Sequence, residues 1–256
     1  MRVLSVHSHK GGAGKTTLAL LMARRFAELG KKVCVVDLDF LGAGISPAIQ
    51  CPKPKKYLDE ALLAAEVAEE MPSISTLVVP HAWSSKHKID VILNTGAEVS
   101  VRPRGKTDGL RSCHEQMRRL LDMEEDTQII GQRLLMLLAG LEGAKYDEVV
   151  LDCHPTLDEI SRPVLAIQSR RPSETSAVLL VATPDRAHVY GLLKEIKRRA
   201  ARESDCKIEL DRSVLVINRV EPDQECRPYR STLDNVGLLK ADVQVDKVVG
   251  DEVPTL

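Results

Sequence analysis

Short apolar runs alternate along the chain with longer segments in which apolar residues recur every three or four positions. The runs have the length and continuous apolar character of strands buried on both faces. They lie at 3–6, 32–39, 146–152, 176–184 and 214–219. The segments with helical spacing lie at 18–29, 128–141, 157–168 and 185–202. This alternation predicts an α/β fold, a doubly wound, mostly parallel sheet with helices on both faces.

The remaining segments have weaker patterns. They predict a helix over 57–70, strands over 74–79 and 89–93, and a last strand over 243–249. Residues 40–52 carry glycine and proline and predict a loop that rearranges with the bound ligand. We expect one domain over 1–256, with an insert-like region at about 52–145.

A glycine-rich turn joins the first predicted strand to the first predicted helix. Strand, glycine-rich turn and helix form the context in which a phosphate-binding loop works. Backbone N–H groups of the turn can contact phosphate oxygens, the lysine can reach the β- and γ-phosphates, and the following hydroxyl can bind Mg²⁺. The candidate residues are Gly11, Gly12, Ala13, Gly14, Lys15, Thr16 and Thr17.

Polar side chains follow three other predicted strands. Asp37 and Asp39 end the second strand, Asp152 ends the strand over 146–152, and Asn218 ends the strand over 214–219. The carboxyl ends of parallel strands gather at one edge of a sheet, where ligands bind. We therefore expect these side chains to lie near the glycine-rich turn.

The segment from Lys10 to Thr17 resembles the deviant Walker A signature of the ParA/MinD family of ATPases. The resemblance implies ATP and Mg²⁺ as cofactors, with Lys15 as a catalytic residue. It also implies that Lys10 reaches across a homodimer interface to the nucleotide of the other subunit. The expected function is a slow ATPase that dimerises around two ATP molecules, is stimulated by a partner protein, and positions or segregates cargo.

The resemblance also assigns roles to the residues at the strand ends. Asp39 orients or activates the attacking water, and Asp37 assists the Mg²⁺ shell. Asp152 holds Mg²⁺ through a water, opposite Thr16. Asn218 reads the adenine edge, for which its amide offers one donor and one acceptor. Family members usually have a glycine in the turn after the carboxylate that corresponds to Asp152. This glycine is absent here, where Cys153 and His154 follow. These two residues alone do not make a zinc site.

Other functions share this loop and stay open. A metallocluster carrier or reductase needs a cysteine pair at a dimer face, for which only Cys113 and Cys153 can be proposed. A small-molecule kinase or ligase of the dethiobiotin-synthetase type needs a substrate pocket. A nucleotide-gated binding module would hydrolyse ATP only incidentally.

Charge and composition indicate which kinds of partner the chain could bind. The net charge is −1, so DNA binding would need a local basic patch. One candidate is the helix over 185–202, whose basic residues are Lys194, Lys197, Arg198, Arg199 and Arg202. This face either binds DNA through the phosphate backbone or is solvated. A second basic stretch, at 100–121, precedes an acidic one. The only tryptophan, Trp83, is either a partner-binding anchor or a lid over the core.

Location is predicted from what the sequence lacks. The six cysteines have no C-x-x-C spacing, which indicates a reduced, cytoplasmic protein. We expect no signal peptide and no transmembrane segment. The tail at 251–256 has no long basic amphipathic helix, which argues against MinD-type membrane attachment.

Overall fold

The computed structural model describes most of the chain. It covers residues 1–40, 42, 44–46, 48–49, 52–63, 72–82, 87–96, 113, 115–117, 119, 127–155, 161–202 and 213–219. Trp83, most of the 100–121 stretch, the predicted strand at 243–249 and the tail lie outside these residues.

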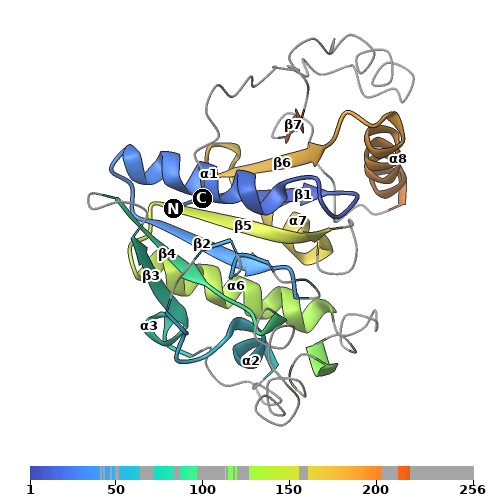
Figure 1. The fold of residues 1–256 in the computed structure, drawn as a ribbon. Helices are drawn as coiled ribbons and strands as arrows, with labels where there is room; N and C mark the ends of the chain where they lie inside the picture. Colours follow the sequence, from blue (N-terminus) through green and yellow to red (C-terminus); the bar gives the residue numbers. More distant parts are fainter. Residues whose placement is uncertain are drawn as a thin grey trace, which may run out of the picture.

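A seven-stranded sheet forms the centre of the protein, in the order β3-β4-β2-β5-β1-β6-β7 (Figure 1). Every pairing is parallel except that of β3 with β4 at one edge. The strands are β1 (Arg2–Ser8), β2 (Val33–Leu38), β3 (Val78–Ala82), β4 (Lys88–Ile92), β5 (Glu148–Pro155), β6 (Ser176–Ala182) and β7 (Ser213–Ile217). The doubly wound, mostly parallel α/β fold is confirmed.

Helices cover both faces of the sheet. They are α1 (Lys15–Glu28), α2 (Leu58–Leu63), α3 (Ile74–Leu77), α6 (Thr127–Gly143), α7 (Ser161–Ser169) and α8 (Arg186–Arg202), with the 3₁₀ turn η2 (Ser173–Thr175). Alternate residues of β2 point to opposite faces, as a strand requires. Val33 and Val35 pack with α1, whereas Cys34 and Leu38 pack with α2, α6 and α7.

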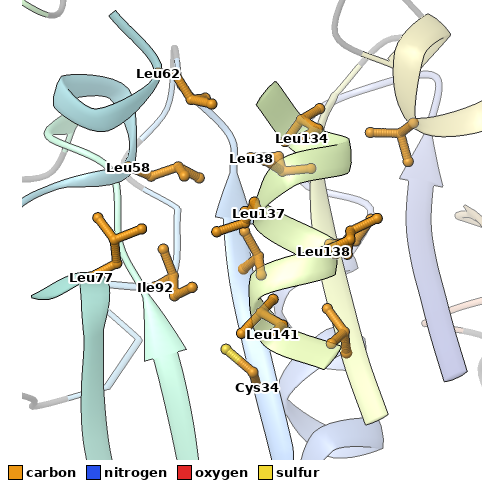
Figure 2. Close-up of a cluster of buried hydrophobic side chains, with 14 of the residues drawn as sticks. Cys34, Leu38, Leu58, Leu62, Leu77, Ile92, Leu134, Leu137, Leu138 and Leu141 are labelled. Carbon is orange, nitrogen blue, oxygen red and sulfur yellow. The ribbon is translucent and has the colours of Figure 1, made fainter. Parts of the chain in front are cut away.

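The face beneath α6 holds a leucine-rich core (Figure 2). Leu134, Leu137, Leu138 and Leu141 recur at helical spacing and are at most 4 % exposed. They pack in one cluster with side chains of α2, α3, β2 and β4, namely Leu58, Leu62, Leu77, Cys34, Leu38 and Ile92. Each fully buried leucine stabilises the fold by roughly 1.5–3 kcal/mol. The described parts of region 52–145 therefore share the sheet and its core.

The predicted strand over 74–79 was wrong in its first half. Residues Ile74–Leu77 form the short helix α3, and the strand runs from Val78 to Ala82. Both the backbone N–H and the hydroxyl of Thr76 donate to the Ser73 carbonyl, each at 2.8 Å, and this closes a turn where β-branched residues favoured a strand. Pro80 is accommodated because β3 is an edge strand.

The other boundaries shift by a few residues. The helix predicted over 57–70 is described at 58–63 as α2, and the helix predicted over 157–168 is described at 161–169 as α7. None of the described helices is long and apolar enough to cross a membrane.

Candidate functional site

The register of the central strands brings the predicted site residues together. In the pairing of β2 with β5, Asp37 lies opposite Asp152, and in that of β1 with β5, Val6 lies opposite Asp152. Neighbouring strands are about 4.8 Å apart. Asp152 therefore lies beside the end of β1, where the glycine-rich loop begins, and Asp37 lies one strand further along the sheet.

The loop conformation depends on two glycines. Gly12 has φ 75° and Gly14 has φ 90°, the left-handed region that glycine adopts without steric cost. Gly14 is the residue before α1, and its carbonyl accepts from the N–H of Leu18 at 3.0 Å. Within the described chain, no side chain caps the start of α1. Its N–H groups and positive dipole end therefore suit an anion.

Lys15 and Asp152 are the buried charges of the site. Lys15 is 6 % exposed and Asp152 is fully buried. Among the described residues, neither carboxylate oxygen of Asp152 has a hydrogen bond of ordinary geometry. Burial raises the pKa of Asp152 to about 6, although the nearby Thr16 hydroxyl and Lys15 ammonium act to lower it. A buried carboxylate beside a hydroxyl suits a hard cation such as Mg²⁺, which takes one or two carboxylates and several waters.

Asp37 holds the loop that follows β2. Its Oδ1 accepts from the N–H of Asp39 at 3.1 Å and its Oδ2 from the N–H of Ile45 at 2.9 Å. Burial, followed by the charge of Asp152, raises the pKa of Asp37 well above its usual range. A Cβ on Gly44 would lie 2.1 Å from Oδ2 of Asp37, so the loop wraps closely around this carboxylate. A role in the Mg²⁺ shell stays a prediction.

Asp39 meets a histidine that the sequence reasoning considered only as a zinc ligand. Nε2 of His154 lies 3.7 Å from Oδ1 of Asp39, and each side chain is 14 % exposed. Leu38 pairs with Cys153 in the β2–β5 register, which brings the two strand ends together. The sequence feature that could have indicated this contact was a histidine two positions after Asp152, the carboxylate of β5.

Asn218 contacts the loop itself. Its Nδ2 donates to the Ala13 carbonyl at 2.8 Å, and its Oδ1 accepts from the N–H of Arg219 at 3.0 Å. A Cβ on Gly14 would lie 2.2 Å from this Nδ2, so the two residues are in close contact. The amide thus braces the phosphate loop, and its contact with adenine stays a prediction.

Helix α8 reaches the start of the loop, a contact that sequence reasoning missed. A Cβ on Gly191 would lie 2.7 Å from Cδ2 of His9. Nδ1 of His188 lies 2.8 Å from the Thr183 hydroxyl, and burial lowers the pKa of His188, with Lys10 and His9 acting in the same direction. Lys10 is exposed, in contrast to the buried Lys15. The sequence feature that could have indicated this contact was a glycine inside an amphipathic helix.

Of the two cysteines that could be proposed for a metallocluster, Cys153 is buried and Cys113 is half-buried. Sγ of Cys153 is buried 3.7 Å from Nε2 of His7. Cys113 is half-buried, and burial raises the pKa of its thiol to about 12, with the charge of Asp59 as the next cause. The described residues contain no group of three or more His, Cys, Asp or Glu placed to hold a metal.

Comparisons with known proteins identify the family of the chain. The family model of the CobQ/CobB/MinD/ParA nucleotide binding domain matches residues 4–253. A putative replication protein A from Rhizobium rhizogenes is 24 % identical over 233 residues, which are 87 % of this chain and 51 % of that protein. The chain thus spans about half the length of this relative.

Two solved structures have the same fold. One is cobyrinic acid a,c-diamide synthase from Mycobacterium smegmatis, solved with an ATP analogue and magnesium. Its sequence is 21 % identical to this chain, and the two structures superpose with a TM-score of 0.54 over 95 % of this chain and 84 % of the synthase chain. The other is a plasmid partition protein from Borrelia burgdorferi, which is 17 % identical in sequence. It superposes with a TM-score of 0.54 over 91 % of this chain and 84 % of the partition protein. With its glycine-rich loop and the family match over nearly its whole length, the chain belongs to the CobQ/CobB/MinD/ParA nucleotide-binding domain family.

Proposed function

We propose that this protein is an ATP-hydrolysing molecular switch of the ParA/MinD type. The observation that carries the proposal is the fully buried carboxylate of Asp152, which lies near the Thr16 hydroxyl and the Lys15 ammonium beside the glycine-rich loop. A buried charge of this kind is costly without a partner. MgATP would supply the cation for Asp152 and the phosphates for Lys15 and the loop.

The reaction is phosphoryl transfer from ATP to water, which yields ADP and phosphate. The loop N–H groups and Lys15 would hold the β- and γ-phosphates, and Thr16 and Asp152 would hold Mg²⁺. When bound there, the cation would supply neutralisation of the charge that develops on the phosphate oxygens. Asp39 orients the attacking water, and His154 lies close enough to fix the direction of that carboxylate. Catalysis is thus positioning and charge stabilisation, without a covalent intermediate.

The proposed switch works as an ATP-bound homodimer in the cytoplasm. Lys10 is exposed and would reach the nucleotide of the second subunit. A partner protein stimulates hydrolysis, and the cargo is DNA or a protein complex. The likeness to a plasmid partition protein supports partitioning. The basic residues of α8 between 194 and 202 are the proposed contact with DNA phosphates, which would be independent of sequence.

The test is substitution of the buried lysine. We expect Lys15→Ala to abolish ATP turnover and to weaken binding of a fluorescent ATP analogue at least tenfold. Lys31→Ala, an exposed lysine just beyond α1, is the matched control and should leave both unchanged. Wild-type turnover by Lys15→Ala would refute the site. Turnover that requires an added small-molecule acceptor would indicate a kinase or ligase instead.

A further inference from the structure

The segment that follows β4 contacts the loop that carries Asp37 and Asp39. Asn94 is 2 % exposed, and its Nδ2 donates to the carbonyl of Asp39 at 3.0 Å and that of Asp37 at 3.5 Å. Its Oδ1 accepts from the N–H of Gly96 at 2.8 Å. One buried amide therefore joins the strand end of β4 to the backbone on both sides of Leu38.

The sheet explains why this amide is needed. β4 pairs with β2 only from Cys34 to Val36, so the backbone ladder stops before Asp37. Beyond that point the ladder between β2 and β4 has ended, and buried carbonyls there need donors from other groups. The amide of Asn94 supplies an N–H donor where the ladder has ended.

Two glycines make the contact close. A Cβ on Gly96 would lie 2.2 Å from the carbonyl oxygen of Gly42, and a Cβ on Gly42 would lie 2.5 Å from Oδ2 of Asp39. The N–H of Gly42 also donates to the Asp39 carbonyl at 3.2 Å. The backbone after β4 therefore packs directly on the turn that holds the Asp39 carboxylate.

A buried carboxylate holds the segment in turn. Asp59 is 1 % exposed and accepts from both the N–H of Thr95, at 3.1 Å, and the Thr95 hydroxyl. The N–H of Leu58 donates to the Leu93 carbonyl at 2.8 Å. Leu58 and Leu62 anchor α2 in the same core as Leu38, as Figure 2 shows. The segment that carries Asn94 is therefore held by α2, which is itself packed in the core.

We propose that Asn94 is a positioning residue for hydrolysis, which sets the direction of the Asp39 carboxylate by fixing the carbonyls of Asp37 and Asp39. The Asp59–Thr95 pair holds Asn94 in place. This inference rests on the proposed ATPase function, because it assigns Asp39 to the attacking water. Among the described residues, Asn94 makes hydrogen bonds with Asp37, Asp39 and Gly96 and none with the phosphate loop, Lys15 or Asp152, so we expect its loss to change the rate and not nucleotide affinity.

The test separates kcat from nucleotide binding. Asn94→Asp keeps the size of the side chain but loses the donor, and Asn94→Ala loses the whole amide. We expect both variants to lower kcat at least tenfold while the Kd for a fluorescent ADP analogue changes less than threefold. Leu141→Ala, a core variant on α6, is the stability control and should lower the unfolding midpoint without changing kcat.

Amide hydrogen exchange in the nucleotide-free protein gives a readout independent of turnover. We expect Asn94→Asp to raise exchange at the amides of Gly42 and Ile45 at least tenfold, with no change at Leu18 in the first turn of α1. Unchanged exchange at Gly42 and Ile45, or losses of kcat and affinity in equal proportion, would overturn the role of Asn94. Absence of turnover in the wild type would refute the proposed function instead, and the exchange comparison would still decide the role of Asn94.

Discussion

At the scale of single residues, the site is built at a cost in stability. Asp152 is fully buried, and among the described residues its oxygens lack hydrogen bonds of ordinary geometry. Its pKa is raised to about 6, which means that the folded state disfavours the charged form. Sites prepared for a charged ligand often destabilise the protein without that ligand. Asp152 is therefore the residue at which stability and function should conflict most clearly.

We expect Asp152→Asn to stabilise the nucleotide-free protein by roughly 1–3 kcal/mol at pH 7–8, since one pKa unit corresponds to about 1.4 kcal/mol. A carboxyl group with a raised folded-state pKa destabilises the fold fully above that pKa and not at all below its unfolded pKa. The advantage of the variant should therefore disappear as the pH falls from about 6 to about 4. Urea unfolding across this pH range measures it.

The same variant should lose the Mg²⁺ dependence of nucleotide binding. Glu115→Gln, which removes an exposed carboxylate, is the control and should change neither property. A destabilised Asp152→Asn protein at pH 7–8 would show that the carboxylate has a stabilising partner in solution.

At the scale of elements, helix α8 packs against the residue that precedes the phosphate loop. Figure 1 shows α8 beyond the arrowhead of β6. The contact is made at Gly191, whose missing side chain leaves room for the ring of His9. His9 directly precedes Lys10, so a displacement of its ring moves the start of the loop. The position of α8 should therefore affect nucleotide binding.

We expect Gly191→Ala to weaken nucleotide binding about 5- to 160-fold, because the new methyl group would lie 2.7 Å from the His9 ring and overpacking costs about 1–3 kcal/mol. His9→Ala in the same protein should restore most of the affinity by removing the clash. Calorimetric titration with ADP measures both. Gly143→Ala, where a Cβ meets nothing within 4 Å, is the matched control and should leave affinity unchanged. Equal affinities of Gly191→Ala and the wild type would contradict the coupling.

The elements also show what the sequence could and could not predict. The strands that carry or directly precede Asp37, Asp39, Asp152 and Asn218 were predictable, because long apolar runs and the parallel-sheet rule need only local pattern. The positions of Asn94 and Gly191 were not, because each depends on a contact between segments far apart in the chain. The short helix α3 was missed because two hydrogen bonds to Ser73 outweighed β-branched propensity.

At the scale of the whole molecule, the two lysines of the loop lie in different environments. Lys15 is 6 % exposed and lies near Asp152, as its effect on the pKa of that carboxyl shows. Lys10 is exposed, and the hydroxyl of Ser8 donates to its carbonyl at 2.7 Å, which fixes the backbone but leaves the side chain outside. Among the described residues, Cβ atoms on Gly11 and Gly12 would meet nothing within 4 Å. The proposed second subunit would dock on this side of the loop.

We expect Lys10→Ala to bind ATP within threefold of the wild type but to lose the ATP-dependent dimer, because its ammonium neutralises phosphate charge from across the interface. Light scattering with a non-hydrolysable ATP analogue and Mg²⁺ should report a dimer for the wild type and for Lys31→Ala, and a monomer for Lys10→Ala. Lys15→Ala should also remain a monomer, but for the different reason that it does not retain nucleotide. An unchanged dimer in Lys10→Ala would refute the role of this lysine across the interface, while a monomeric wild type would refute the sandwich dimer itself and leave the single-subunit site to be judged by Lys15→Ala alone.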